Sequence, residues 1–158
     1  MSAEPSKLEE RWSIALPFLI LGSTCIVAGG VTSAATAYNR SQHASWVVAY
    51  LVLVAGVAQV ALGLGQAALS IKTPSKVTVT GELIAWNGGN VAVIVGTLLT
   101  TSLLTDVGGA LLMIALALFV YTARGGHAGW ARQMFRITVL IILLSIPVGL
   151  VLGHTTGN

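Results

Sequence analysis

Apolar residues along the chain gather into five long runs that short polar segments separate. The runs cover residues 13–37, 46–71, 83–104, 107–122 and 134–153. A helix rises about 1.5 Å per residue, so roughly 20 helical residues cross a hydrocarbon core about 30 Å thick. The pattern therefore predicts an all-α integral membrane protein, a bundle of five transmembrane helices. Residues 1–12 precede it as a polar segment, and residues 154–158 follow it as a short tail.

The composition excludes a water-soluble domain. The chain of 158 residues is 55% hydrophobic and 8% charged, with a mean hydropathy of +0.87, whereas soluble domains carry about a quarter charged residues. The net charge of +3 does not indicate nucleic-acid binding, because the basic residues are scattered over the polar segments. In composition the chain resembles small bacterial multi-span proteins, so we expect it in a bacterial cytoplasmic membrane; this likeness implies no function.

The basic residues also predict the orientation. With five crossings and a cytoplasmic N-terminus, the outer side carries only Arg40. The cytoplasmic side then carries Lys7, Arg11, Lys72, Lys76, Arg124, Arg132 and Arg136. Cytoplasmic segments of membrane proteins are enriched in Lys and Arg. The sequence therefore predicts an N-terminus in the cytoplasm and a C-terminus outside.

The first run has an alternative interpretation as a cleaved secretory signal. Ala35-Thr36-Ala37 is similar to a small-residue cleavage site. The segment before the run is net acidic, however, where a signal peptide is positive, and the run exceeds the usual apolar length of about 7–15 residues. We therefore expect a retained membrane helix. Its single cysteine, Cys25, cannot form an intramolecular disulfide.

Two runs carry narrow stripes of polar and small side chains at helical spacing. In the second run the stripe consists of Gly56, Gln59, Gly63, Gln66 and Ser70, and in the third of Asn87, Asn90, Thr97 and Thr101. One interpretation is hydrogen bonding between two helices. The other is a polar passage between the second and third helices. The candidate polar residues are Gln59, Gln66, Asn87, Asn90 and Thr97.

Small residues mark further helix-packing faces. In the first run Gly22, Cys25, Gly29, Ser33 and Thr36 share one side, and in the third Ala85, Gly89, Ala92 and Gly96 lie opposite the asparagines. Small residues let membrane helices approach closely. We therefore expect the third helix to be central, with its amides toward the second helix and its small residues toward another, such as the first.

Three local expectations concern the ends of the third run. Lys76–Thr80 alternates in polarity, which we interpret as an extended loop. Thr105-Asp106 is expected to form a tight turn, with Asp106 as a helix N-cap.

No Asp, Glu, Lys, Arg or His is expected deep in a run, which disfavours ion-coupled transport.

Two sets of charged or metal-binding residues fall in the polar segments. His43, Asp106 and His154 would share the outer surface and are a conceivable zinc or copper ligand set. They come from separate loops without short ligand spacing, and solvated histidines with a capping Asp106 are the simpler interpretation. No histidine stands within a run to hold haem, so no cofactor is expected. Arg124, Arg132 and Arg136 are expected to contact anionic lipid headgroups.

The absence of a catalytic constellation predicts that the protein is not an enzyme. The leading hypothesis is a non-enzymatic membrane protein that works by helix–helix association, as an accessory or assembly subunit or as a homo-oligomer. Its partners would be the lipid bilayer and other membrane subunits or itself. The alternatives are a small-solute transporter or channel that uses the polar stripe, and an outward-facing metal or redox site.

Overall fold

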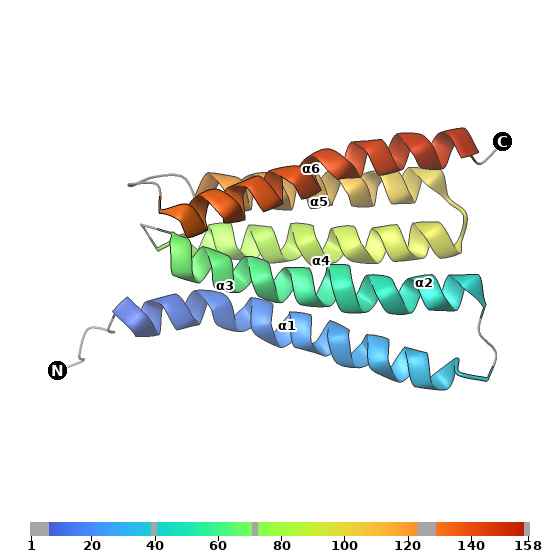
Figure 1. The fold of residues 1–158 in the computed structure, drawn as a ribbon, viewed down its shortest axis with the longest axis horizontal. Helices are drawn as coiled ribbons and strands as arrows, with labels where there is room; N and C mark the ends of the chain where they lie inside the picture. The colour runs from blue at the N-terminus through green and yellow to red at the C-terminus, as the bar shows by residue number, and fades with distance from the viewer. Residues whose placement is uncertain (1–6, 39–40, 71–72, 123–128, 157–158) are drawn as a thin grey trace. The chain divides into compact units, whose positions relative to one another are not determined.

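The computed structural model describes residues 7–38, 41–70, 73–122 and 129–156, and within them the chain is all-helical, as predicted. The chain divides into two compact units, Met1–Ser75 and Lys76–Asn158. The first unit holds α1 (Lys7–Ala35), α2 (Gln42–Tyr50), the π-helix η1 (Leu51–Ala58) and α3 (Gln59–Leu69). The second unit holds α4 (Lys76–Leu98), α5 (Ser102–Thr122) and α6 (Trp130–Thr156) (Figure 1).

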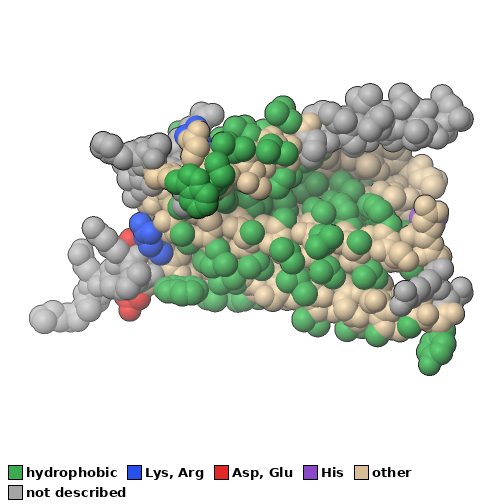
Figure 2. Space-filling model, in the orientation of Figure 1, with side chains coloured by type: hydrophobic (Ala, Val, Ile, Leu, Met, Phe, Trp, Pro, Cys, Tyr) green, Lys and Arg blue, Asp and Glu red, His purple; other side chains and the backbone are tan. Residues whose placement is uncertain are grey.

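Over the described residues, three helical segments are long and apolar enough to cross a membrane. They are Glu9–Ala35, Gln42–Leu69 and Ser102–Thr122, the last containing the shortest predicted run. Hydrophobic side chains are spread over the surface (Figure 2). On these helices the large exposed ones include Ile20 and Leu53. Such surfaces suit lipid better than water, so these helices are compatible with an integral membrane protein.

The first unit is a helical hairpin in which α1 packs along η1 and α3 (Figure 1). Gly22 of α1 and Gly56 of η1 meet backbone to backbone. A methyl group on Gly22 would lie 2.9 Å from the Gly56 carbonyl oxygen, and one on Gly56 would lie 3.1 Å from the Gly22 oxygen. Gly29 lies against Val52 in the same seam. The packing face predicted for the first helix therefore contacts η1 and its neighbours within the same unit.

The second unit contains a tighter seam between α4 and α5. A methyl group on Gly89 would lie 2.9 Å from the Gly108 oxygen, and one on Gly96 would lie 2.6 Å from the Thr105 nitrogen. We named the first helix as a candidate partner for this small-residue face, but the structure places α5 there. Within this unit α5 is the middle helix, since it packs against both α4 and α6.

The ends of α4 differ from the sequence-based expectation. Lys76–Thr80 is the first part of α4, so the extended loop was wrong. Thr105 and Asp106 lie inside α5, which begins at Ser102, so the tight turn and the N-cap were also wrong. The connection comes earlier, at residues 99–101.

Thr100 makes that early turn possible. Its φ is +51°, in the left-handed region. Its N–H donates to the Thr97 oxygen at 3.3 Å, while the N–H of Thr101 donates to the Gly96 oxygen at 2.8 Å. This pair of bonds is a Schellman motif, which usually has glycine at the left-handed position. A threonine there gave no sequence signal for the end of a helix.

Candidate functional site: the deeply buried polar side chains

The polar stripe of the second predicted helix is a single buried face. It comprises Gly56, Gln59, Gly63, Gln66 and Ser70, and every member is buried. Its two glycines pack against α1: Gly56 meets Ile26 and Gly22, and Gly63 meets Phe18. This side of η1 and α3 therefore contributes to the core of the first unit.

Gln59 has the least satisfied side chain of this stripe. It is completely buried, and neither Nε2 nor Oε1 has a hydrogen-bond partner within the described part of the chain. Gln59 follows η1 directly, and π-helical segments are rare and often lie at functional sites. Burying an amide without partners costs on the order of 2 kcal/mol or more. A water or solute at this position would remove that cost.

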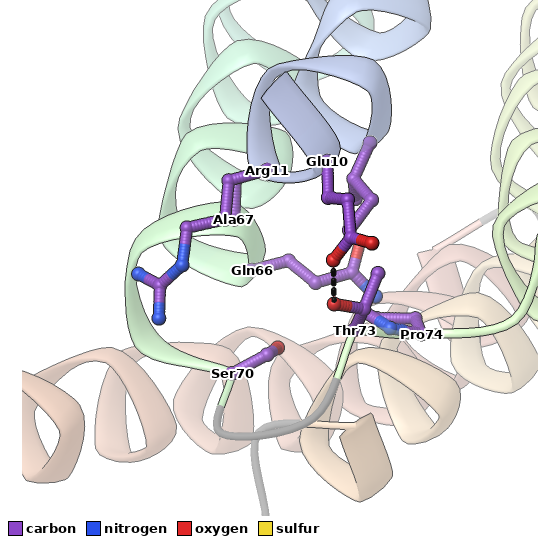
Figure 3. A pocket seen from close by; sticks show the side chains of 8 residues that line it. Glu10, Arg11, Gln66, Ala67, Ser70, Thr73 and Pro74 are labelled. Carbon is purple, nitrogen blue, oxygen red and sulfur yellow. Dashed lines mark hydrogen bonds between the residues drawn. The ribbon is translucent and has the colours of Figure 1, made fainter. Parts of the chain in front are cut away.

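Gln66 and Ser70 line a polar pocket where α3 ends beside the start of α1 (Figure 3). The pocket has a volume of about 180 Å³ and is lined by Glu10, Arg11, Ile14, Gln66, Ala67, Ser70, Thr73 and Pro74. The Thr73 hydroxyl donates to Glu10 Oε2 at 3.3 Å, and Arg11 Nη1 donates to the Ala68 carbonyl oxygen at 3.2 Å. The two charged side chains thus both bond neutral partners.

The second unit buries a polar ladder that sequence reasoning missed. Glu82, Trp86 and Asn90 stand four residues apart on α4 and are at most 3% exposed. The Thr122 hydroxyl of α5 donates to Glu82 Oε1 at 3.5 Å. Because α4 begins at Lys76, Glu82 lies about 9 Å along the helix, at about 1.5 Å per residue. The i, i+4, i+8 spacing was the available signal, but the segment before Glu82 had been interpreted as extended.

The predicted asparagines bond within their own helix. Asn87 Nδ2 donates to the Leu83 oxygen and Asn90 Nδ2 to the Trp86 oxygen, both at 2.9 Å. Within the described residues, Asn90 Oδ1 and Trp86 Nε1 have no hydrogen-bond partner. Thr97 is half-buried near the end of α4. The passage between the second and third helices stays a prediction, because these residues and the glutamines belong to different units.

The metal set also stays a prediction. His43 is exposed on α2 and Asp106 is half-buried on α5, in separate units. His154 lies in α6, but its side chain is outside the described residues. Among the side chains that are described, no three His, Cys, Asp or Glu residues could hold a metal ion.

The predicted lipid-binding arginines are only partly described. Arg124 lies outside the described residues, as does the side chain of Arg132, while Arg136 is half-buried on α6. In the comparisons with known proteins, no protein-family model, curated protein or solved structure matches this chain.

Proposed function

We propose that this chain is a small multi-pass membrane protein that binds a small polar solute and lets it pass. The observation that carries this proposal is the buried Gln59 amide, whose donor and acceptor have no partner within the described residues. Native proteins rarely leave buried polar atoms unpaired, and water or a ligand is a common explanation. An amide offers hydrogen bonds to an uncharged polar solute without fixing it by charge.

The buried ladder of the second unit supports the same proposal. Glu82 adds a carboxylate to a buried face that also presents the Asn90 oxygen and the Trp86 N–H. Ionisable residues inside membrane helices commonly mark solute, ion or proton pathways. The sequence-based argument against ion-coupled transport assumed that no such group was buried, and Glu82 removes that assumption. A proton or a cationic solute is therefore a second class of cargo to test.

The association hypothesis loses one of the two observations that motivated it. Its support was the absence of a catalytic constellation together with an excess of small-residue faces over what one small bundle needs, and the second of these is the structural one. Within the units these faces are occupied: Gly22 and Gly29 by η1 and its neighbours, and Gly89 and Gly96 by α5. Association as an accessory subunit or homo-oligomer, with itself or another membrane subunit as partner, therefore ranks behind solute passage.

The proposal includes a five-span topology in a bacterial cytoplasmic membrane. Three helical segments have the required length and apolarity. We add α4 and α6 because α4 has 23 residues and α6 has 27. The excess of Lys and Arg then favours a cytoplasmic N-terminus and an outer C-terminus. Labelling of single cysteines at the two chain ends, in a Cys25→Ala background, should reach them from opposite sides of intact vesicles.

Flux through proteoliposomes tests the function directly. The probes are urea and glycerol, followed by light scattering after an osmotic step, and protons, followed by an enclosed pH-sensitive dye. We expect vesicles with the full chain to transmit at least one probe faster than empty vesicles. Gln59→Leu should return the flux of an uncharged probe to the empty-vesicle rate, and Glu82→Gln should do the same for protons.

The matched control is Gln133→Leu, the same substitution at an exposed position on α6. It should transmit like the unmodified chain. Equal rates in protein-containing and empty vesicles for all three probes would contradict the proposal. So would full flux in the Gln59→Leu and Glu82→Gln double variant. Stable oligomers or a co-purifying subunit together with no flux would favour association instead.

A further inference from the structure

The polar pocket where α3 ends beside the start of α1 is lined by charged, hydroxyl and apolar side chains. We propose that it binds a phosphate ester that carries a primary ammonium group, the chemistry of a phosphatidylethanolamine headgroup. The inference goes beyond the proposed solute passage, since it concerns another place and needs only that α1 and α3 meet the bilayer surface.

The pocket contains a buried hydroxyl, that of Ser70. Ser70 is 7% exposed, and among the described residues its Oγ has no hydrogen-bond partner. It stands just after α3, and in Figure 3 its hydroxyl points into the space that Gln66, Thr73 and Glu10 surround. A buried hydroxyl gains by donating to a ligand oxygen, because an unmet donor costs about 1–3 kcal/mol.

The pocket also offers one group of each charge. Toward the described residues, Arg11 uses one of its N–H groups, on the Ala68 carbonyl oxygen, and a guanidinium has five. Glu10 accepts one bond from Thr73, and an ionised carboxylate can accept about four. Arg11 therefore retains donors suited to a phosphate, and Glu10 retains acceptors suited to an ammonium group. A ligand with one charge of each sign satisfies both.

The position of the pocket selects a lipid headgroup from among such zwitterions. It lies where the membrane-compatible segments Glu9–Ala35 and Gln42–Leu69 begin and end. Trp12, next to Arg11, is 61% exposed, and tryptophan is enriched at the level of the headgroups. The apolar lining by Ile14, Ala67 and Pro74 suits the carbon atoms that link phosphate to ammonium.

Calorimetric titration of the delipidated full chain in detergent tests this site. The probes are dihexanoyl phosphatidylethanolamine, dihexanoyl phosphatidylcholine, dihexanoyl phosphatidylglycerol and soluble phosphoethanolamine. We expect the ethanolamine lipid to bind roughly 10-fold or more tightly than the choline or glycerol lipid, since one charge-assisted hydrogen bond accounts for about that factor. Phosphoethanolamine binding as tightly as its lipid would keep the site and assign it to a free solute.

Variants separate the roles of the side chains. Arg11→Gln and Glu10→Gln should each weaken binding of the ethanolamine lipid about 10-fold, and Ser70→Ala by several-fold. Glu9→Gln is the matched control, since the exposed Glu9 does not line the pocket, and it should leave binding within about twofold.

Folding of each variant is checked by circular dichroism and by a single peak in size exclusion. Ser70→Ala keeps the test valid if Arg11→Gln disturbs the end of α3. Equal binding of all three lipids would overturn the proposal. It would also fail if the folded Glu10→Gln and Ser70→Ala variants both bound the ethanolamine lipid like the unmodified chain.

Discussion

In both units two helices pack closely through glycines, but the buried polar side chains of the two units differ in their hydrogen bonding. Each has a pair of helices that approach through glycines, Gly22 with Gly56 in the first unit and Gly89 with Gly108 in the second. In the second unit the buried amide and carboxylate bond nearby groups: Asn90 donates to its own helix, and Glu82 accepts from Thr122. In the first unit both polar atoms of Gln59 lack a partner among the described residues.

The difference lies in how much of its hydrogen-bonding capacity each buried amide uses within the protein. An amide that donates to the carbonyl four residues back, as Asn90 does, satisfies its donor and leaves only its oxygen without a partner among the described residues. An amide buried without any partner lowers stability, and proteins keep such groups mainly where a ligand or water uses them. Enlarging a glycine in a seam should therefore lower the free energy of unfolding, and removing an unpartnered buried amide should raise it.

The largest expected effect is at the backbone contact of the second unit. In Gly108→Ala the new methyl group would lie 2.7 Å from the Val93 nitrogen and 2.8 Å from the Gly89 oxygen. Both are backbone atoms, so α4 and α5 must separate. We expect the free energy of unfolding in detergent to fall by about 3 kcal/mol. Gly30→Ala, which meets open space, is the control and should not reduce stability. Equal losses at both positions would contradict the seam.

A smaller loss is expected where a glycine of the first unit meets a side chain. In Gly63→Ala the methyl group would meet Phe18, whose Cγ lies 2.9 Å away and whose ring is fully buried. We expect a loss of about 2 kcal/mol in the same unfolding measurement, because the methyl group meets one side chain, Cβ included, rather than backbone atoms of the other helix. Phe18→Ala removes two of the three close atoms, Cγ and Cδ2, and should lessen the effect of Gly63→Ala when the two are combined. Strict additivity of the two losses would show that the contact is not their cause.

Gln59→Leu should change stability in the other direction. Removing an unpartnered buried amide and keeping a similar volume should raise the free energy of unfolding by about 1–2 kcal/mol. Asn90→Leu, in the second unit, should gain less, since it also removes the bond from Nδ2 to the Trp86 oxygen. Both are measured by thermal unfolding in detergent. A clear loss of stability in Gln59→Leu would mean that the amide has a structural partner.

Periodicity predicted that the described residues are helical, because the apolar runs are long and separated by short polar segments. It also predicted the buried stripe through Gln59 and Gln66, since residues seven apart share a face of a helix. It could not assign the partner of the Gly89 face, because small residues show that a helix approaches and not which one. It failed at Lys76–Thr80, where alternating Val and Thr suggested an extended loop but these residues begin α4. Because of that error Glu82 stood outside the predicted run 83–104 and was not expected to be buried within a helix.

The smallest expected effect is at the turn that leaves α4. Thr100 has a φ of +51°, where a β-branched residue is strained by about 1–2 kcal/mol and glycine is not. Glycine loses more backbone entropy on folding, about 0.5–1 kcal/mol, so Thr100→Gly should raise the free energy of unfolding by about 0.5–1 kcal/mol. Thr101→Gly is the matched control: it is the same exchange one residue later, where no left-handed φ offsets the entropy, so it should lower stability slightly. Chemical unfolding of both variants in the same detergent shows whether each substitution raises or lowers the free energy of unfolding. A loss in Thr100→Gly as large as in Thr101→Gly would show that the Thr100 turn holds no strain.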